Sequence, residues 1–225
     1  MSTSTATKNH RLRRALVLDF GGVISRTLFE THALTERALG LRPGTLAWKG
    51  PFDPASDALW QAMQRDEISE RDYWLARTRE VGALLGEDWT QMQQFVRRAR
   101  GADPQAVIRP EALQAIAQAR ARGTPLAILS NELDLFYGAD FRERLPFLRE
   151  FNVIVDATHS GILKPDVRAY RAVEQALGLP AAQCVLVDDQ ARNVRGARDA
   201  GWHAVALDVR DPGAAFAQAI AWLDG

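Results

Sequence analysis

Five short apolar runs alternate with longer amphipathic stretches along most of this chain. Short apolar runs bounded by turn residues are typical of strands that are buried on both faces of a parallel sheet. Strands that alternate with helices imply right-handed crossovers, which keep neighbouring strands parallel. We therefore predict an α/β fold with one parallel sheet, whose strands lie at residues 15–18, 125–129, 152–155, 184–187 and 203–207.

The segment between the first two predicted strands has a different pattern. Residues 28–104 carry apolar positions at helical spacing, interrupted by Gly and Pro residues, and contain no strand-like run. Ser69, followed three residues later by Asp72, resembles a capping box at the start of one of these helices. We predict that residues 28–104 form a separate helical domain inserted into a core of residues 1–27 and 105–225.

The amino-acid composition argues against several classes of function. The 225 residues include 28 basic and 28 acidic side chains, so the net charge offers no attraction to nucleic acid or an anionic membrane. No run approaches the ~18 apolar residues of a membrane span, and residues 1–14 lack the apolar stretch of a signal peptide. Cys184, the single cysteine, cannot form an intrachain disulfide and fits a reducing compartment. We expect a cytoplasmic monomer or homodimer without nucleic-acid or membrane partners.

Polar residues follow the apolar run at the end of several predicted strands. The carboxyl ends of parallel strands meet at one edge of the sheet, which is where ligands bind in open α/β folds. This edge therefore brings together carboxylates, a hydroxyl, an amide and an ammonium group. In chain order these groups belong to Asp19, Ser130, Asn131, Lys164, Asp188 and Asp189.

These residue types suit a reaction at a phosphate group. Crowded carboxylates repel one another unless a cation lies among them, and hard oxygen ligands with open positions suit Mg²⁺. Lys164 and backbone N–H groups near Gly21 and Gly22, which allow a sharp turn, would hold a phosphate. Asp19 would then attack the phosphorus atom. Taken alone, the stretch around Asp19 is equally typical of a strand followed by a turn and an exposed aspartate.

The same residues resemble the motifs of the haloacid dehalogenase superfamily, and the resemblance covers nearly the whole chain. It identifies Asp19 as the nucleophile, Ser130 as a phosphate-binding hydroxyl and Lys164 as the cation of the third motif. The run VDDQARN, which contains Asp188 and Asp189, is the most specific match. The resemblance thus implies that these five residues perform the chemistry.

The family resemblance also implies a ligand set for Mg²⁺. Asp19, Asp188 and Asp189 match its carboxylate ligands, and the backbone carbonyl of Gly21 matches its carbonyl ligand. Asn193, one helical turn after Asp189, is expected to support the acid pair by hydrogen bonding.

The resemblance further implies a Rossmann-like three-layer core and a small helical cap that selects the substrate. The inserted residues 28–104 occupy the position of that cap. The residues expected to contact the substrate are Phe20, Gly21, Gly22, Asn131 and Trp48, with His159 as a further candidate.

Gly21 departs from the family pattern. Most phosphatases of the superfamily carry a second Asp two residues after the nucleophile, which acts as general acid and base, and Gly21 has no side chain for this role. The run DFGGV resembles a subset that includes sugar-1-phosphate phosphatases. A positioned general acid contributes about 10²–10⁴-fold, so leaving groups of low basicity should be favoured unless a neighbouring group supplies the proton.

We predict a Mg²⁺-dependent phosphatase that hydrolyses a small phosphorylated metabolite, with a sugar phosphate as one candidate, through an aspartyl-phosphate. One alternative is a metal-independent hydrolytic dehalogenase of a 2-haloacid, in which Asp19 attacks carbon and a halide leaves without a proton. Asp188 and Asp189 argue against it, because the resemblance implies that dehalogenases do not keep this adjacent pair. A second alternative is a catalytically weak family member that binds a ligand or partner, which the missing acid at Gly21 keeps open.

Overall fold

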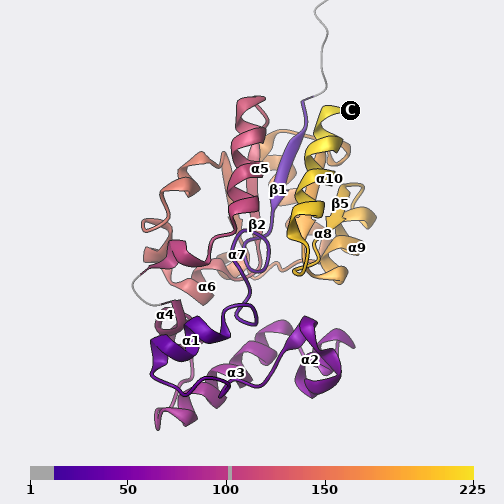
Figure 1. Ribbon diagram of the computed structural model, residues 1–225. Coiled ribbons are helices and arrows are strands. Elements are labelled where there is room, and N and C mark those ends of the chain that lie inside the picture. Colours follow the sequence, from indigo (N-terminus) through magenta and orange to yellow (C-terminus); the bar gives the residue numbers. More distant parts are fainter. Residues whose placement is uncertain (1–12, 101–102) are drawn as a thin grey trace, which may run out of the picture.

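A five-stranded parallel sheet lies at the centre of the computed structural model, which describes residues 13–100 and 103–225 (Figure 1). The strand order is β3-β2-β1-β4-β5, so the first strand of the chain is the central one. The sheet predicted from the apolar runs is confirmed, while residues 1–12 of the predicted core lie outside the described ranges. The strands are β1 (Ala15–Leu18), β2 (Leu126–Ser130), β3 (Val153–Asp156), β4 (Cys184–Asp188) and β5 (His203–Ala206).

Helices cover both faces of the sheet and give the core three layers (Figure 1). In β1, Leu16 and Leu18 pack in the same cluster as α5 and α10, whereas Ala15 and Val17 pack in the cluster that contains α8 and α9. All four side chains are fully buried, which explains why this strand is apolar without alternation. The covering helices are α5 (Pro110–Ala121), α8 (Val167–Leu177), α9 (Ala191–Asp199) and α10 (Pro212–Asp224).

Short helices form the remaining connections of the core. They are η3 (Pro104–Val107), α6 (Leu133–Tyr137), η4 (Ala139–Arg142), η5 (Pro146–Glu150), α7 (Ala157–Ser160) and η6 (Ala181–Gln183).

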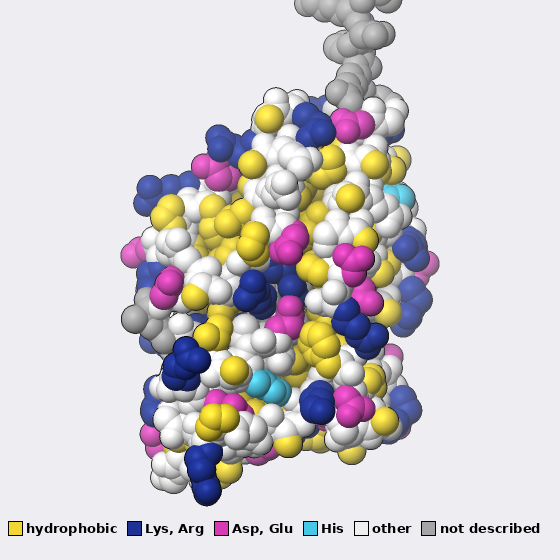
Figure 2. All heavy atoms as spheres, in the orientation of Figure 1, with side chains coloured by type: hydrophobic (Ala, Val, Ile, Leu, Met, Phe, Trp, Pro, Cys, Tyr) yellow, Lys and Arg dark blue, Asp and Glu magenta, His cyan; other side chains and the backbone are white. Residues whose placement is uncertain are grey.

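The surface of the molecule carries both signs of charge. Acidic and basic side chains are interspersed over the face seen in Figure 2, in keeping with the zero net charge.

The chain between β1 and η3 folds into helices that lie beyond the carboxyl ends of the strands (Figure 1). Where the structure describes it, this segment supplies no strand to the sheet, and its last helix, α4, packs against α1, α3 and α6. The bounds 28–104 for a separate cap domain remain a prediction. No helix in the described ranges is both long enough and apolar enough to cross a membrane. The helices of the segment are α1 (His32–Leu39), η1 (Gly50–Phe52), η2 (Pro54–Ser56), α2 (Ala58–Gln64), α3 (Glu70–Leu84) and α4 (Met92–Arg100).

A capping box fixes the start of α3. Ser69 Oγ accepts a hydrogen bond from the backbone N–H of Asp72, and the Asp72 carboxylate accepts one from the backbone N–H of Ser69, both at 3.1 Å. These bonds satisfy backbone donors that lack a partner within the helix. The motif read from the sequence is confirmed, and it fixes the first helical turn, which carries Glu70 and Arg71.

An aromatic cluster ties the inserted helices to one another and to the core. The Phe29 ring lies edge-on to Trp48 and Trp60, with centroid distances of 5.4 Å and 5.3 Å. Trp74 lies 5.3 Å from Phe29 and 6.1 Å from Phe136, which belongs to α6. Because aromatic pairs contribute about 0.5–1.5 kcal/mol each beyond their burial, this cluster stabilises the position of the inserted segment against α6.

A buried polar network joins α2 to α3. The Asp57 carboxylate accepts hydrogen bonds from the Trp60 backbone N–H at 2.9 Å, from the Tyr73 hydroxyl at 2.8 Å and from the Arg77 guanidinium at 2.6 Å. Its side chain is 0% exposed. Burial raises the pKa of Tyr73, so this hydroxyl stays a neutral donor. Asp57 is therefore both the cap of α2 and a buried counter-ion of Arg77.

Asp57→Ala should lower the free energy of unfolding by about 3–5 kcal/mol, because breaking a buried ion pair leaves the remaining charge undercompensated. Urea denaturation followed by tryptophan fluorescence measures this loss. Glu67→Ala is the matched control, since Glu67 pairs with Arg65 on the surface and both side chains are more than half exposed. The control should keep the wild-type midpoint, and equal shifts in both variants would contradict the role of the network.

Candidate active site

The Lys164 ammonium group lies between two carboxylates at the carboxyl edge of the sheet. Its Nζ donates hydrogen bonds to Asp19 Oδ1 at 2.9 Å and to Asp188 Oδ2 at 2.6 Å. The side chain is 1% exposed, so these bonds compensate the cost of removing the ammonium group from water. Burial alone would lower the pKa of Lys164, but the charges of Asp188 and Asp19 raise it above its usual value. The group therefore stays protonated.

Three segments far apart in the sequence bring these groups together. Asp19 directly follows the central strand β1, and its backbone N–H donates to the Val187 carbonyl of the neighbouring strand at 3.0 Å. Asp188 is the last residue of that strand, β4. Lys164 comes from the loop before α8, where its N–H donates to Asn131 Oδ1 at 2.7 Å and its carbonyl accepts from Asn131 Nδ2 at 3.2 Å. The sheet positions two members of the cluster, and Asn131 positions the third.

Asp188 is fixed by groups that follow it in the chain. Its Oδ1 accepts a hydrogen bond from the Gln190 backbone N–H at 2.9 Å. Asn193 Nδ2 donates to both carboxylate oxygens, at 3.1 Å and 3.2 Å. Asn193 lies in α9, and its amide bonds Asp188, the first member of the acid pair that the sequence interpretation expected it to support.

The positive charge around Asp19 and Asp189 is too small to compensate their carboxylates. Burial raises the pKa of Asp19 to about 7, because the attraction of Lys164 is opposed by the charge of Asp188. Burial, followed by the charges of Asp188 and Asp19, raises the pKa of Asp189 well above its usual value. Within residues 13–100 and 103–225, no hydrogen bond or ion pair reaches the Asp189 carboxylate. Its ionised form therefore needs a further cation.

The carboxylates fit a divalent metal ion. Asp19, Asp188 and Asp189 each offer an oxygen, and these atoms all lie within 4.8 Å of one another. Facing one ammonium group, the three carboxylates leave two negative charges uncompensated, which equals the charge of a divalent ion. Carboxylate oxygens are the donors that Mg²⁺ prefers in proteins. Gly21, whose carbonyl is the further expected ligand, lines the same cavity.

The turn after Asp19 requires a glycine at position 22. Gly22 has a φ of +80°, and a Cβ atom there would lie 2.3 Å from Asp189 Oδ2. Its carbonyl accepts hydrogen bonds from Arg109 Nε at 3.2 Å and Nη2 at 3.1 Å, which fix the turn from behind. A Cβ at Gly21 would have no neighbouring atom within 4 Å, so only the second glycine is imposed by packing.

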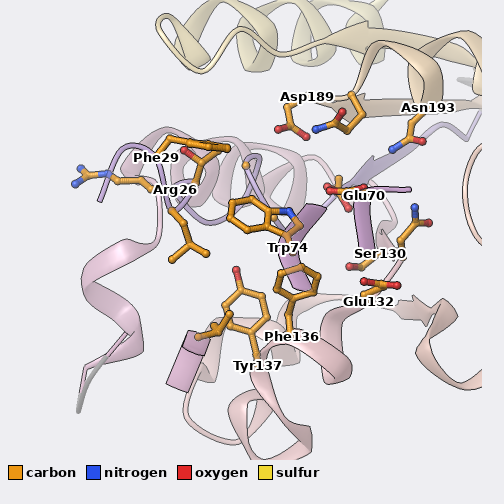
Figure 3. A pocket seen from close by; sticks show the side chains of 18 of the residues that line it. Arg26, Phe29, Glu70, Trp74, Ser130, Glu132, Phe136, Tyr137, Asp189 and Asn193 are labelled. Carbon is orange, nitrogen blue, oxygen red and sulfur yellow. The ribbon is translucent and has the colours of Figure 1, made fainter. Parts of the chain in front are cut away.

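A cavity of about 100 Å³ opens beside the carboxylates, between the sheet edge and the inserted helices. One part of its wall is polar and is formed by Asp19, Gly21, Gly22, Ser130, Asn131, Lys164 and Asp189. Another part is mainly aromatic, and Figure 3 shows Phe29, Trp74, Phe136 and Tyr137 around the opening. Sites for drug-sized ligands usually measure about 300–1,000 Å³, so this cavity suits a small ligand with an anionic group and a less polar remainder.

Two consecutive residues of α3 reach from the inserted helices to the core. Glu70 Oε2 accepts a hydrogen bond from Arg192 Nη2 of α9 at 3.2 Å. Arg71 forms an ion pair with Glu132, which follows β2. Both glutamates line the cavity, and burial raises the pKa of each carboxyl group against the attraction of its arginine. The first turn of α3 is thereby joined to two separate walls of the site.

Phe20, Trp48 and His159 do not line the cavity, contrary to the expectation from the sequence. The Phe20 ring points into the core, where it packs edge-on against Tyr137 at 5.2 Å. Trp48 belongs to the buried aromatic cluster, whose other rings hold it away from the opening. His159 is exposed, and its Nε2 lies 2.8 Å from Asp134 Oδ2.

Sequence reasoning missed several residues that line the cavity, among them Glu70, Trp60, Trp74 and Glu132. The helical spacing of the two tryptophans predicts interior positions, and both do pack in the aromatic cluster while also facing the cavity. Glu70 directly follows Ser69, so the capping box located it at the start of a helix. No local signal showed which part of the core that helix turn faces.

Comparisons with known proteins place the chain in one family. The haloacid dehalogenase-like hydrolase profile matches residues 10–201. Phosphatase MT3486 from Mycobacterium tuberculosis is 30% identical over 146 residues, which cover 65% of this chain and 64% of that protein. Phosphoserine phosphatase from Thermus thermophilus is 30% identical over 166 residues, covering 72% of this chain and 57% of that protein. The structure of L-2-haloacid dehalogenase RSc1362 matches with a TM-score of 0.63 at 20% identity, covering 94% of this chain and 99% of that one.

The matches cover only part of the curated relatives, and the similar proteins include both phosphatases and dehalogenases. The matching regions cover from 9% to 64% of the curated relatives' own lengths. The likeness to the dehalogenase structure shows a shared fold. Because phosphatases and dehalogenases both occur among the similar proteins, the choice between the two reactions rests on the residues of the site.

Gly22→Ala should weaken the binding of Mg²⁺ at least about tenfold, because the added methyl group would displace the Asp189 carboxylate. Isothermal titration calorimetry with MgCl₂ measures this change. Gly21→Ala is the matched control, since its methyl group meets open space and should leave the affinity within about twofold of the wild type. Similar losses in both variants would contradict a specific clash with Asp189.

Proposed function

Since this chain belongs to the haloacid dehalogenase-like hydrolases, we propose that it is a Mg²⁺-dependent phosphatase of a small phosphorylated metabolite. The observation that carries this proposal is the third carboxylate, Asp189, which lies with Asp19 and Asp188 but has no positive partner among the described residues. A reaction that needed only Asp19 and Lys164 would give no reason to keep this uncompensated charge. A metal-dependent reaction uses it as a ligand.

The nucleophile in this proposal is Asp19. Its carboxylate attacks phosphorus, the bond to the leaving oxygen breaks, and the phosphoryl group is held on Asp19 until water releases it. Lys164 and the polar groups of Ser130 and Asn131, which line the same wall, stabilise the phosphate oxygens. When bound, Mg²⁺ would neutralise negative charge on the phosphate and bring it toward the nucleophile.

Asp188 and Asn193 position this machinery. Asp188 is wholly buried and holds the Lys164 ammonium group at 2.6 Å, so it keeps that charge directed toward Asp19. Asn193 holds Asp188 in turn, with bonds to both oxygens. The proposal gives these two residues an orienting role, in addition to any direct or water-mediated contact of Asp188 with the metal.

The curated relatives support phosphate over halide chemistry. Two of them, at 30% identity, are named as a phosphatase and as a phosphoserine phosphatase. The small cavity supports a metabolite-sized substrate, and its aromatic wall offers an apolar surface on which the face of a sugar ring can pack. The proposed substrate class is therefore a small phosphate ester, with sugar phosphates as candidates.

Two competing functions make different predictions. A hydrolytic dehalogenase would use Asp19 and Lys164 without a metal, in line with the fold shared with L-2-haloacid dehalogenase RSc1362. A weak binding protein would hold a phosphorylated ligand without turnover, in line with the absence of a side chain at Gly21. Release of phosphate, release of halide and the absence of both separate the three functions.

The wild-type protein should release phosphate from small phosphate esters with Mg²⁺, and EDTA should reduce this release to background, because Asp19 and Asp189 lose their counter-ion. A colorimetric phosphate assay over a panel of sugar, acyl and aryl phosphates measures it. Asp189→Asn should lose the stimulation by Mg²⁺ while keeping the wild-type circular dichroism spectrum. Halide release from 2-chloropropionate that is insensitive to EDTA would instead identify a dehalogenase.

Asp19→Asn should reduce turnover to background, because the amide cannot act as the nucleophile. Mass spectrometry of the acid-quenched wild-type protein should locate a phosphoryl group on Asp19 during turnover. Asp166→Asn is the control, since Asp166 lies near Lys164 in the sequence but pairs with Arg168 on the surface. Turnover without a phosphorylated Asp19 would point to direct attack by water.

A further inference from the structure

The position that normally supplies a general acid is open in this site. A Cβ atom at Gly21 would have no neighbouring atom within 4 Å, although Gly21 lines the cavity beside Asp19. An alkoxide leaving group needs a proton when its bond to phosphorus breaks, and the attacking water must lose one in the second step. Because Gly21 has no side chain, a titratable group elsewhere in the cavity wall is the candidate for these two proton transfers.

Two carboxyl groups outside the proposed metal cluster line this cavity, Glu70 and Glu132. Glu70 is the first residue of α3, and Figure 3 shows it at the cavity together with Asp189 and Ser130. Arg192 contacts its Oε2, and no hydrogen bond to its Oε1 is present in the part of the chain that the structure describes. Arg192 therefore holds Oε2 of Glu70, and Oε1 remains available to give or accept a proton.

The electrostatic coupling favours Glu70 over Glu132. The charge of Glu70 is among the causes that raise the pKa of both Asp19 and Asp189. Glu132 is not among the main causes for either group, and its own neighbours are Arg71, Glu70 and Asp156. Glu70 therefore shares the charged surroundings of the proposed nucleophile within the cavity wall, and we assign it the role in preference to Glu132.

We propose that Glu70, contributed by the inserted helices, performs the proton transfers for which position 21 has no side chain. The inference rests on the proposed phosphatase function and adds a catalytic residue to it. Its position is fixed from two sides, by the capping box of Ser69 and Asp72 at the helix start and by the bond to Arg192 of the core.

The two proton transfers balance over one turnover. As Asp19 forms its bond to phosphorus and the bond to the leaving oxygen breaks, the Glu70 carboxyl group gives its proton to that oxygen and becomes a carboxylate. When water attacks the phosphorylated Asp19, the Glu70 carboxylate takes one proton from the water. The bond between phosphorus and Asp19 breaks, phosphate leaves, and Glu70 is protonated again.

Glu70→Gln tests the proposal with a series of substrates that differ in the basicity of the leaving group. Turnover of alkyl phosphates should fall by about 10²–10⁴-fold, because their alkoxides need the proton. Turnover of p-nitrophenyl phosphate, whose leaving group needs no proton, should fall less than about tenfold in the first step. The variant should therefore show a steeper dependence of rate on leaving-group pKa than the wild type.

Glu132→Gln is the matched control, because it removes the other cavity glutamate and also breaks an ion pair to α3. Its rates should keep the wild-type dependence on leaving-group pKa, whatever their absolute level. Gly21→Asp in the Glu70→Gln background should restore turnover of alkyl phosphates, since the new carboxyl group occupies open space. Recovery in the double variant would show that the lost function was proton transfer.

Three outcomes overturn the assignment. A loss of the first-step rate in Glu70→Gln that is equal for all leaving groups would make Glu70 a residue that only positions the inserted helices. A steeper dependence in Glu132→Gln and not in Glu70→Gln would transfer the role to Glu132. Wild-type protein that hydrolyses none of the phosphate esters, p-nitrophenyl phosphate included, would overturn the phosphatase function itself, and the role of Glu70 with it. A retained first burst of p-nitrophenol from p-nitrophenyl phosphate in Glu70→Gln reports that the variant is folded.

Discussion

The ion cluster in which the Lys164 ammonium group bridges Asp19 and Asp188 is the interaction on which the site depends. Its distances of 2.9 Å and 2.6 Å require three chain segments to end at one place. The parallel sheet meets this requirement for Asp19 and Asp188, because strands β1 and β4 end side by side. Asn131 brings Lys164 to the same edge. A buried ion pair contributes little to stability on balance, so the cluster is better understood as a functional constraint. The hydrophobic core offsets the free energy that its desolvation costs.

The inserted helices complete what the sheet edge leaves open. The core supplies the carboxylates and the ammonium group, while Trp60, Trp74 and Glu70 close the cavity from the other side. The aromatic cluster around Phe29 connects these helices to α6, so the wall of the cavity and its attachment to the core are built from the same rings. This explains why residues that look like ordinary core residues in the sequence also face the cavity.

Most of the core and its charged residues could be predicted because the signals are local. An apolar strand followed by Asp19 or by Asp188 and Asp189 reveals both the strand and the edge at which it ends. The placement of Glu70 could not be predicted, because it depends on a contact of α3 with an element more than a hundred residues later, Arg192 of α9. Trp48 was misplaced for a related reason. Loop aromatic residues are typical of binding sites, but whether the ring turns inward is decided by its tertiary neighbours.

The adjacency of Glu70 and Arg71 has a consequence for the kinetics of the molecule. One residue carries a negative charge to α9 and the next carries a positive charge to the loop after β2, so a movement of the first turn of α3 must release both contacts together. If this turn moved away from the core, both contacts would break together, and water would enter as the proposed proton donor withdraws. Since Arg71 is about half exposed, dissolved ions screen part of this attachment. Ionic strength would thus act on the residence time of a ligand in the cavity, separately from the chemical step.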